Sequence, residues 1–299
     1  MDLVSVEAPP NVAWKKAWSP SSVNLFLQCS LKYWFEKVGR WQSRPNEALV
    51  AGRIVHGVLE DLLSRPEGER TREVARSAYM LQQQDHMQGL EDVVDISDVR
   101  ERSGTALTSY FEVEDPNDVR ISTDGIERVV SGIVMDVPLE GYVDRLEYSP
   151  TGLRIVDYKT GTPKPPYMAS YWRQQMLYAA VSDQVVDHGQ VTEVALLYLG
   201  EEPRLLVRPV TSFAVTRVSE SLSQVNEARE EYQAESRWQA TTGPLCKYCA
   251  FEKVCPAKRK RAPTPGSSES EAKLAESPEV YKREARSTET TEMTSEEKE

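Results

Sequence analysis

Two short β-type segments joined by a tight loop constrain the fold of this chain most strongly. The segments GYVDRLEY (141–148) and LRIVDYK (153–159) are rich in β-branched and aromatic residues, and only the four residues SPTG separate them. A loop of this length and composition closes antiparallel hairpins. The register that the loop imposes places Asp144 opposite Asp157. The sequence therefore predicts a hairpin that carries an opposed pair of acids.

The opposed acids need something to offset their repulsion. Directly opposed residues in antiparallel strands have Cβ atoms about 4.5 to 5.5 Å apart, and like charges so placed are destabilising. A proton on one carboxyl would relieve this, and so would a hard divalent cation such as Mg²⁺ or Mn²⁺, which prefers carboxylate oxygens. Lys159 shares a face with Asp157, where its ammonium can orient a water molecule or stabilise charge on a phosphate. From the hairpin alone, two solvated acids with Lys159 as counter-ion remain the alternative interpretation.

The order of the remaining segments predicts an α/β fold. β-branched runs bounded by turn residues lie between Ile126 and Val210, and helical patterns precede, interrupt and follow them. Helices, three strands, a helix, two strands and a helix fit a mixed central β-sheet flanked by helices. Near the start, Ser19 is a plausible N-cap before Pro20, and the helix that follows is expected to carry Cys29 near its middle. The other expected helices cover residues 51–65, parts of 66–120, 168–182 and about 213–236.

Composition divides the chain into three parts. We expect an N-terminal extension over residues 1–18, one large domain over residues 19–261 and a disordered acidic tail over residues 262–299. The tail holds ten Glu against five Lys or Arg and few large apolar residues, so it is not expected to bury enough surface to order itself. It contributes -5 to the net charge of -11, and the body is only modestly acidic. A local basic groove for a polyanion is compatible with that charge.

The four cysteines predict a metal site. No stretch approaches the roughly 18 to 20 apolar residues that cross a bilayer, and the N-terminus MDLVSVEAPP lacks the layout of a secretion signal, so we expect a cytoplasmic protein without a membrane partner. Thiols stay reduced there, which favours metal ligation over disulfides. Three cysteines form a C-x2-C-x5-C pattern, and the fourth lies far upstream. Four thiolates hold Zn²⁺ or an iron–sulfur cluster, and spacing alone does not decide between them.

Four short motifs follow one another along the chain. They are GRIVHGVLE (52–60), GYVDR (141–145), IVDYKTG (155–161) and QQMLY (174–178). Their order and spacing closely resemble the RecB-like branch of the PD-(D/E)XK nuclease superfamily. The resemblance runs from about Ser19 to Pro256 and implies a restriction-endonuclease-like core for the predicted sheet. Val143 stands where the superfamily name has proline, which is a loosely kept position.

The resemblance implies a complete active site. In that branch a histidine and two acids hold the divalent metal, here Mg²⁺ or Mn²⁺, and the main-chain carbonyl after the second acid is a candidate for a further ligand. A lysine assists the attack on the phosphodiester, and a glutamine and a tyrosine one helical turn apart contact the substrate or order the site. The corresponding metal ligands are His56, Asp144, Asp157 and the main-chain carbonyl of Tyr158. The corresponding catalytic residues are Asp144, Asp157, Lys159, Gln174 and Tyr178.

The cysteine layout is similar to that of a subset of this branch, which includes the CRISPR-associated exonucleases and the nuclease lobe of AddB. Those proteins place one cysteine before the nuclease motifs and three after them, around a 4Fe-4S cluster. The resemblance therefore implies a 4Fe-4S cluster, with Zn²⁺ as the alternative. The ligands would be Cys29, Cys246, Cys249 and Cys255. Such a cluster would fasten the N-terminal helix to the C-terminal segment, because metal binding energy becomes folding energy.

Taken together, the resemblance implies a metal-dependent DNA exonuclease like the CRISPR-associated and phage-encoded exonucleases. It would act on single-stranded DNA or frayed ends, in recombination and repair or in CRISPR-type spacer acquisition, with the proteins of those processes as possible partners. The chain has no GxxxxGK[ST] phosphate loop, so we expect no helicase part. The alternative is a non-catalytic DNA-binding or adaptor protein of the same fold with a structural metal site. The retained pair of repelling carboxylates favours the enzyme.

Overall fold

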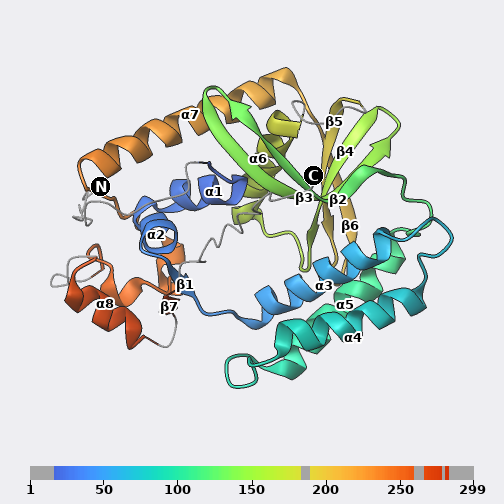
Figure 1. Cartoon of the computed structure of the whole chain (residues 1–299), viewed down its shortest axis with the longest axis horizontal. Helices are drawn as coiled ribbons and strands as arrows, with labels where there is room; N and C mark the ends of the chain where they lie inside the picture. Colours follow the sequence, from blue (N-terminus) through green and yellow to red (C-terminus); the bar gives the residue numbers. More distant parts are fainter. Residues whose placement is uncertain (1–16, 183–188, 259–265, 278–279, 283–299) are drawn as a thin grey trace, which may run out of the picture.

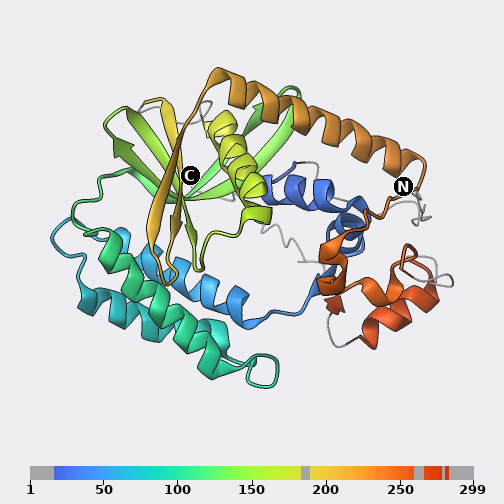
Figure 2. The same cartoon turned by 180° about the vertical axis from the view of Figure 1, so that it is seen from behind.

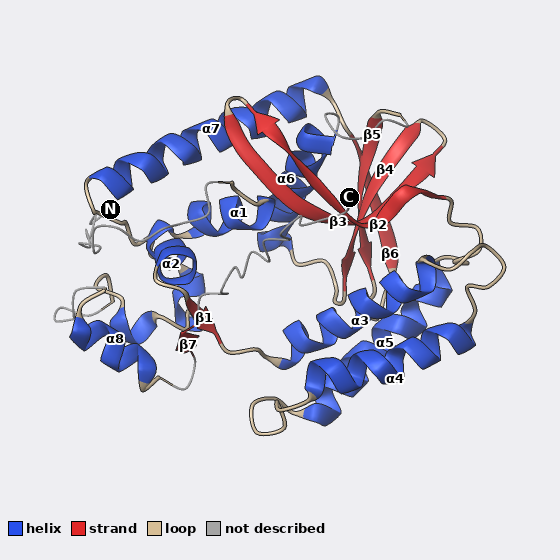
Figure 3. Ribbon diagram, in the orientation of Figure 1, coloured by secondary structure: helices blue, strands red, loops and turns tan. Residues whose placement is uncertain are grey.

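The computed structural model describes residues 17–182, 189–258, 266–277 and 280–282. A five-stranded sheet has helices on both faces, and a smaller lobe lies beside it (Figures 1 and 3). The helices are α1 (Pro20–Gln28), α2 (Ser30–Tyr33), the π-helix η1 (Trp34–Val38), α3 (Glu47–Leu63), α4 (Arg72–Met87), α5 (Ile96–Val113), α6 (Pro165–Ser182), α7 (Ser212–Ala234), the 3-10 helices η2 (Pro244–Tyr248) and η3 (Glu252–Val254), and α8 (Ser268–Ala275). The strands are β1 (Trp41–Ser43), β2 (Ile121–Val134), β3 (Val137–Ser149), β4 (Gly152–Lys159), β5 (Val191–Tyr198), β6 (Arg204–Pro209) and β7 (Val280–Lys282).

The central sheet is mixed, as the sequence predicted, and has the strand order β2-β3-β4-β5-β6. β4 and β5 run parallel because α6 connects them, and the other neighbouring strands are antiparallel. The β3–β4 hairpin has the predicted register, with Tyr148 opposite Leu153 and Arg145 opposite Val156. The predicted order of three strands, a helix, two strands and a helix is also confirmed.

Helices cover the two faces of the sheet and form two apolar cores. On one face, Ile54 and Leu59 of α3 join Val156 of β4 in a cluster that includes residues of α4 and α5. On the other face, Leu177 of α6 joins Ile155 of β4 in a cluster with α1 and α7, and Figure 2 shows α7 running along this side. β4 is therefore fixed from both sides, since its alternate residues face opposite cores. None of the helices within the described residues is long and apolar enough to cross a bilayer.

The N-terminal helix begins as predicted but breaks at Cys29. Ser19 caps α1 through a reciprocal pair of hydrogen bonds, and Pro20 follows it. Cys29 has extended dihedral angles (φ -168°, ψ 109°) and separates α1 from α2, so the prediction that it lies near the middle of one helix is wrong. At the break, the N–H of Leu31 donates to the carbonyl of Gln239 at 2.9 Å instead of continuing the helical pattern. The break thus ties the N-terminal helices to the segment after α7.

The smaller lobe joins the C-terminal part of the described chain to the N-terminal helices. β7 pairs with β1, and Leu274 of α8 and Val280 of β7 are buried in the core shared with α1 and α2. The acidic tail predicted to be disordered over residues 262–299 therefore contains a helix and a strand. Its few apolar side chains explain the difference, because they are the ones that pack against this lobe. The rest of that tail, and residues 1–16 of the predicted N-terminal extension, lie outside the described residues.

Candidate active site

Asp144 lies at the point where β3 and β4 stop pairing. Counted from the turn, the β3–β4 pairs end at Arg145 and Val156, so the predicted opposition of Asp144 and Asp157 falls one position beyond the last pair. The Oδ2 of Asp144 instead accepts a hydrogen bond from the backbone N–H of Tyr158 at 3.0 Å. This bond brings the Asp144 carboxylate to the stretch of backbone that carries Asp157. Burial acts to raise the pKa of Asp144, but the neighbouring His56 outweighs it and lowers that pKa. Asp144 is therefore ionised in the folded protein.

His56 reaches the same carboxylate from helix α3. The apolar stripe of α3 is buried against the sheet, which holds the imidazole over the ends of β3 and β4. Its Nδ1 lies 3.4 Å from Asp144 Oδ2, and its Nε2 lies 3.2 Å from the main-chain carbonyl oxygen of Tyr158. Burial acts to lower the pKa of His56, but Asp144 and Asp157 outweigh it and raise the pKa to about 9. Without a metal ion the imidazole is a cation held between an acid and a carbonyl.

Asp157 and Lys159 form a buried ion pair beside this cluster. Asp157 is only 6% exposed, and its Oδ2 contacts the Lys159 ammonium. Burial raises the pKa of Asp157 in spite of Lys159, and the negative charge of Asp144 adds to the rise. Burial acts to lower the pKa of Lys159, but Asp157 outweighs it and raises the pKa, so Lys159 remains charged. The ammonium also lies 4.6 Å from the ring centroid of Tyr171 on α6.

Gln174 and Tyr178 border the acids from one face of α6. The Nε2 of Gln174 lies 3.5 Å from Asp157 Oδ1, a long hydrogen bond that restrains the carboxylate. Tyr178 is 8% exposed and packs so closely on Gly141 of β3 that an added methyl group would lie 2.7 Å from its ring. Burial, Asp144 and Asp157 together raise the pKa of the Tyr178 hydroxyl, which stays neutral. The structure thus brings both residues to the acids that the resemblance assigns to them.

Glu127 of β2 is a member of the cluster that the motifs did not indicate. Its ligand atom and those of His56 and Asp144 all lie within 4.8 Å of one another. Glu127 has a positive φ of 45°, a conformation unusual for a residue with a side chain and one that interrupts the regular alternation of the strand. Burial and Asp144 raise the pKa of Glu127 to about 7.

The sequence does contain one signal for Glu127. Ile126 pairs with Arg145 and Arg128 pairs with Val143, so the β2–β3 register places Glu127 opposite Asp144. That register follows from the turn at residues 135–136, between β2 and β3. Extending the hairpin argument by one strand would therefore have found this third acid.

The assembled donors fit a hard divalent cation. They comprise one imidazole, one main-chain carbonyl and the carboxylates of Glu127 and Asp144, an oxygen-rich set of the kind that Mg²⁺ and Mn²⁺ prefer. The carboxylate of Asp157 is paired with Lys159 and lies beside this set, outside the group of ligand atoms that fall within 4.8 Å of one another. Acids this close to one another disfavour their joint ionisation, as the raised pKa values of Glu127 and Asp157 indicate. A dication would remove that penalty and allow all three acids to ionise together.

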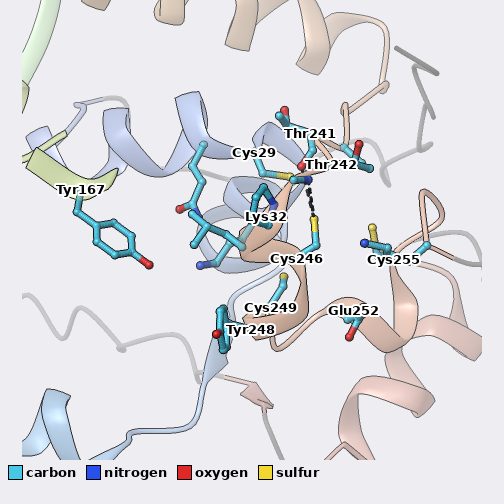
Figure 4. A pocket seen from close by; sticks show the side chains of 16 residues that line it. Cys29, Lys32, Tyr167, Thr241, Thr242, Cys246, Tyr248, Cys249, Glu252 and Cys255 are labelled. Carbon is cyan, nitrogen blue, oxygen red and sulfur yellow. Dashed lines mark hydrogen bonds between the residues drawn. The ribbon is translucent and has the colours of Figure 1, made fainter. Parts of the chain in front are cut away.

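The four cysteines surround one cavity of about 400 Å³ (Figure 4). Cys29 approaches from the break between α1 and α2, and Cys246, Cys249 and Cys255 come from the η2–η3 region. The N–H of Gly243 donates to the Cys246 sulfur at 3.3 Å. Burial raises the pKa of Cys249 and of Cys255. Within the described residues, no three of these sulfurs lie within 4.8 Å of one another.

A comparison with known families identifies the class of protein to which this fold belongs. A family model for the PD-(D/E)XK nuclease superfamily matches residues 17–256, which is most of the chain. The chain therefore belongs to the PD-(D/E)XK nuclease superfamily. This confirms the superfamily to which the sequence motifs pointed, whereas the RecB-like branch and the iron–sulfur link remain predictions.

Two solved structures illustrate how far the likeness extends. A "putative exonuclease" from Eubacterium rectale has a TM-score of 0.53 and 14% sequence identity, with 78% of this chain and 88% of that chain covered. At this identity the likeness shows the fold alone. The structure of SSO0001 has a TM-score of 0.30 and 16% identity over 69% of this chain and 86% of that chain, which is too low to support an argument. No curated protein matches the chain.

Proposed function

We propose that the protein is a metal-dependent DNA exonuclease that hydrolyses phosphodiester bonds in single-stranded DNA or at frayed ends. The observation that carries this proposal is the cluster of His56, Glu127 and Asp144, with the Asp157–Lys159 ion pair beside it at the end of β4. A site for a dication beside a permanently charged lysine suits the attack of water on a phosphodiester. The solved structure of similar fold is named a "putative exonuclease", which agrees with the proposed activity.

The metal ligands of the proposed site are His56, Asp144, Asp157 and the carbonyl of Tyr158, with Glu127 as a further carboxylate. A bound Mg²⁺ or Mn²⁺ supplies Lewis acidity and lowers the pKa of a bound water. The chain's own contribution is to fix the ligands before substrate arrives. The backbone N–H of Tyr158 holds Asp144, and Gln174 restrains Asp157.

Lys159 acts as a cation in this scheme. Its pKa is raised by Asp157, so it does not take a proton from water at neutral pH. Its ammonium instead stabilises the negative charge that develops on the phosphate oxygens in the transition state. This interaction is stronger in a partly dehydrated site than in water. Tyr171 beneath the ammonium limits its position through a cation–π contact at 4.6 Å.

The deciding experiment is a nuclease assay on end-labelled single-stranded DNA with Mn²⁺ or Mg²⁺. Wild type is expected to degrade the linear strand and to leave a circular single strand intact, as an exonuclease must. Asp157→Ala and Lys159→Ala are each expected to lower the cleavage rate by at least about 10²-fold. Asp85→Ala and Lys273→Ala, which change exposed residues of α4 and α8, are expected to keep the activity. Equal degradation by the site variants and wild type would overturn the proposed site. DNA binding without cleavage by wild type would favour the non-catalytic adaptor.

The cysteine cavity is proposed to hold a 4Fe-4S cluster. A zinc ion bound to thiolates at about 2.3 Å would bring their sulfurs to about 3.8 Å from one another. Four thiolates around one cavity can hold either group. The layout of one cysteine before and three after the nuclease motifs, which resembles that of the iron–sulfur nucleases, favours the cluster. Iron and labile-sulfide analysis of anaerobically purified protein tests this, and stoichiometric zinc in a colourless sample would overturn it.

The pathway is also part of the proposal. An exonuclease with this fold and cysteine layout suits DNA recombination and repair or CRISPR-type spacer acquisition, with the proteins of those processes as partners. A pull-down with the full-length protein from its own cells, followed by identification of the co-purified proteins, tests this assignment. Partners from neither process would overturn it.

A further inference from the structure

A basic groove lies between the cysteine cavity and the start of α3. It encloses about 610 Å³ and is lined by the cations Lys32, Arg44, Lys247 and Lys253 with a single acid, Glu252. Arg44, Lys247 and Lys253 are exposed. This concentration of positive charge is local, because the whole chain carries a net charge of -11. The groove thus offers a polyanion a local site of positive charge on a protein whose net charge is negative.

Aromatic side chains accompany these cations. Tyr248 lines the groove, is 75% exposed and has the Lys247 ammonium 4.7 Å from its ring centroid. The neighbouring cysteine cavity shares Tyr248 and Lys32 with the groove and is bordered on its far side by Tyr167 of α6 (Figure 4). Cations interleaved with exposed aromatic rings are the features by which proteins bind a single strand, since phosphates pair with the cations and bases stack on the rings.

The aromatic residues also connect this region to the nuclease site. Tyr167 stacks on Tyr171, with ring centroids 6.3 Å apart and an interplanar angle of 29°. Tyr171 in turn lies under the Lys159 ammonium. A continuous row of rings therefore runs from the catalytic lysine to the border of the cysteine cavity.

Helix α3 gives a second connection between the groove and the site. Asn46, its N-cap, lines the groove, and His56 lies ten residues further along the helix. At 1.5 Å per residue, the two are about 15 Å apart along the helix axis. This length corresponds to about four nucleotides of a strand at 3.4 Å each, and to fewer in a more extended strand.

We propose that this groove binds the phosphate backbone of a single DNA strand and guides the strand to the nuclease site, with bases stacking on Tyr248 and Tyr167. The assignment rests on the proposed nuclease function, which supplies a single strand as ligand. An acidic protein segment would also suit the cations, but it would not use the exposed ring of Tyr248 or the half-buried rings of Tyr167 and Tyr171 that lead to the catalytic lysine. Arg44, Lys247 and Lys253 make the phosphate contacts. Lys32 is left aside because it also lines the cysteine cavity and pairs with Glu36.

The test measures how salt affects binding of a fluorescent oligothymidine to the full-length, anaerobically purified protein. Asp157→Ala in every sample prevents cleavage. Each lost phosphate contact on a single strand reduces the slope of log K against log salt by about 0.7, so Arg44→Ala/Lys247→Ala/Lys253→Ala is expected to reduce it by about 2. Binding at physiological salt is expected to weaken about tenfold or more. Tyr248→Ala should weaken binding about 5- to 150-fold with little change in slope, because it removes stacking and no charge.

A matched triple variant controls for net charge. Arg76→Ala/Arg102→Ala/Arg217→Ala removes three cations from α4, α5 and α7, and it is expected to leave the slope within about 0.3 of wild type. Unchanged melting temperatures and iron contents would show that the groove variant is folded. If the folded groove variant then shows the same salt slope as the control triple variant, the groove does not bind DNA and the inference is overturned. This is also the result expected if the groove binds an acidic protein segment. Cleavage of a tetranucleotide is measured separately, with wild-type Asp157 in place. If the tetranucleotide is cleaved but the groove variant binds like the control, the groove assignment fails while the proposed nuclease function stands.

Discussion

At the scale of single residues, Asp144 is the group on which the others depend. Its carboxylate receives the N–H of Tyr158, lies 3.4 Å from a ring nitrogen of His56 and shares a 4.8 Å cluster with Glu127. Lys159, by contrast, pairs with Asp157. In the proposed mechanism Asp144 binds the metal and Lys159 stabilises charge on the phosphate. Substitutions at the two residues should therefore have different effects.

Asp144→Asn and Lys159→Ala are expected to fail for different reasons. The asparagine removes a charged ligand, so the affinity for Mn²⁺ measured by isothermal titration calorimetry should fall by at least about tenfold. The alanine removes a cation and leaves the acids more negative, so Mn²⁺ should bind at least as tightly as to wild type. Single-turnover cleavage should nevertheless slow by about 10²- to 10³-fold, the usual loss for one electrostatic group at the reacting centre. Loss of Mn²⁺ affinity in Lys159→Ala would contradict this division of roles.

Metal binding should also become stronger as the pH rises. The pKa of His56 is raised from its ordinary 6.5 to about 9, mainly by Asp144 against burial, and that of Glu127 from 4.5 to about 7 by burial and Asp144. Raised pKa values mean that the protonated forms stabilise the metal-free fold at low pH, and this stability is lost as the pH rises through about 7 and 9. Mg²⁺ requires the deprotonated forms. The increase in melting temperature caused by Mg²⁺ should therefore be larger at about pH 9 than at about pH 6.

Two substitutions check the source of this pH dependence in the same thermal-shift measurement. His56→Gln and Glu127→Gln should each flatten it, because each removes one group at which protons and metal compete. Glu101→Gln, an exposed change on α5, is the control and should leave it intact. A metal effect that is the same at both pH values in wild type would contradict the assignment of these two ligands.

How far the site could be predicted from sequence differs from residue to residue. Asp144, Asp157 and Lys159 followed from one turn, because a short loop fixes the register and the register fixes which side chains meet. His56 comes from a helix some ninety residues earlier, and only a resemblance to known nucleases could connect it to the hairpin. Glu127 lies one strand further away, and the same register argument applied to the β2–β3 turn places it opposite Asp144. Its positive φ is the part that no local sequence pattern indicates.

At the scale of secondary-structure elements, the close approach of β3 to α6 and α1 positions the site. A methyl group at Gly141 would lie 2.7 Å from the ring of Tyr178 and 3.2 Å from Pro20. Gly141 is therefore needed for space, since only a residue without a side chain lets the strand and the two helices come this close. The strand that carries Asp144 would otherwise be displaced from the helix that carries Gln174.

Gly141→Ala is accordingly expected to destabilise the protein by about 1 to 3 kcal/mol, the usual cost of overpacking a buried site. Gly104→Ala is the matched control, because a methyl group there meets only the Tyr79 hydroxyl at 3.8 Å within helix α5. That change should stabilise the protein by about 0.5 to 1 kcal/mol, since glycine is unfavourable inside a helix. Urea unfolding measures both, and a loss of stability in Gly104→Ala equal to that in Gly141→Ala would contradict the steric argument.

The elements that the sequence misplaced are those set by distant contacts. The pattern of α1 continues past Cys29, but Gln239 and Ser30 exchange hydrogen bonds that replace those of a continuous helix. Likewise α8 and β7 follow a composition typical of disorder, yet Leu274 and Val280 are buried in the apolar core of the lobe. Local patterns carry no information about partners more than two hundred residues away.

At the scale of the whole molecule, the cysteine cavity joins two segments from opposite ends of the described chain. Phe35 stacks on Phe251 with ring centroids 4.8 Å apart, and Tyr33 stacks on Trp238 at 5.9 Å. Apolar contacts thus already connect the N-terminal helices to the C-terminal segment. A cluster bound to Cys29 and the three later cysteines would make that connection depend on the metal as well.

Removal of the proposed cluster should loosen this connection while the central sheet stays folded. Cys29→Ser and Cys255→Ser are each expected to lower the melting temperature by several degrees and to make residues 241–258 the first site of limited proteolysis, with the far-ultraviolet circular dichroism of the sheet retained. Because one lost ligand already releases the metal, the double variant should be no less stable than either single variant. Two independent packing effects would instead add, and additive losses would show that these thiols stabilise the lobe without a shared metal.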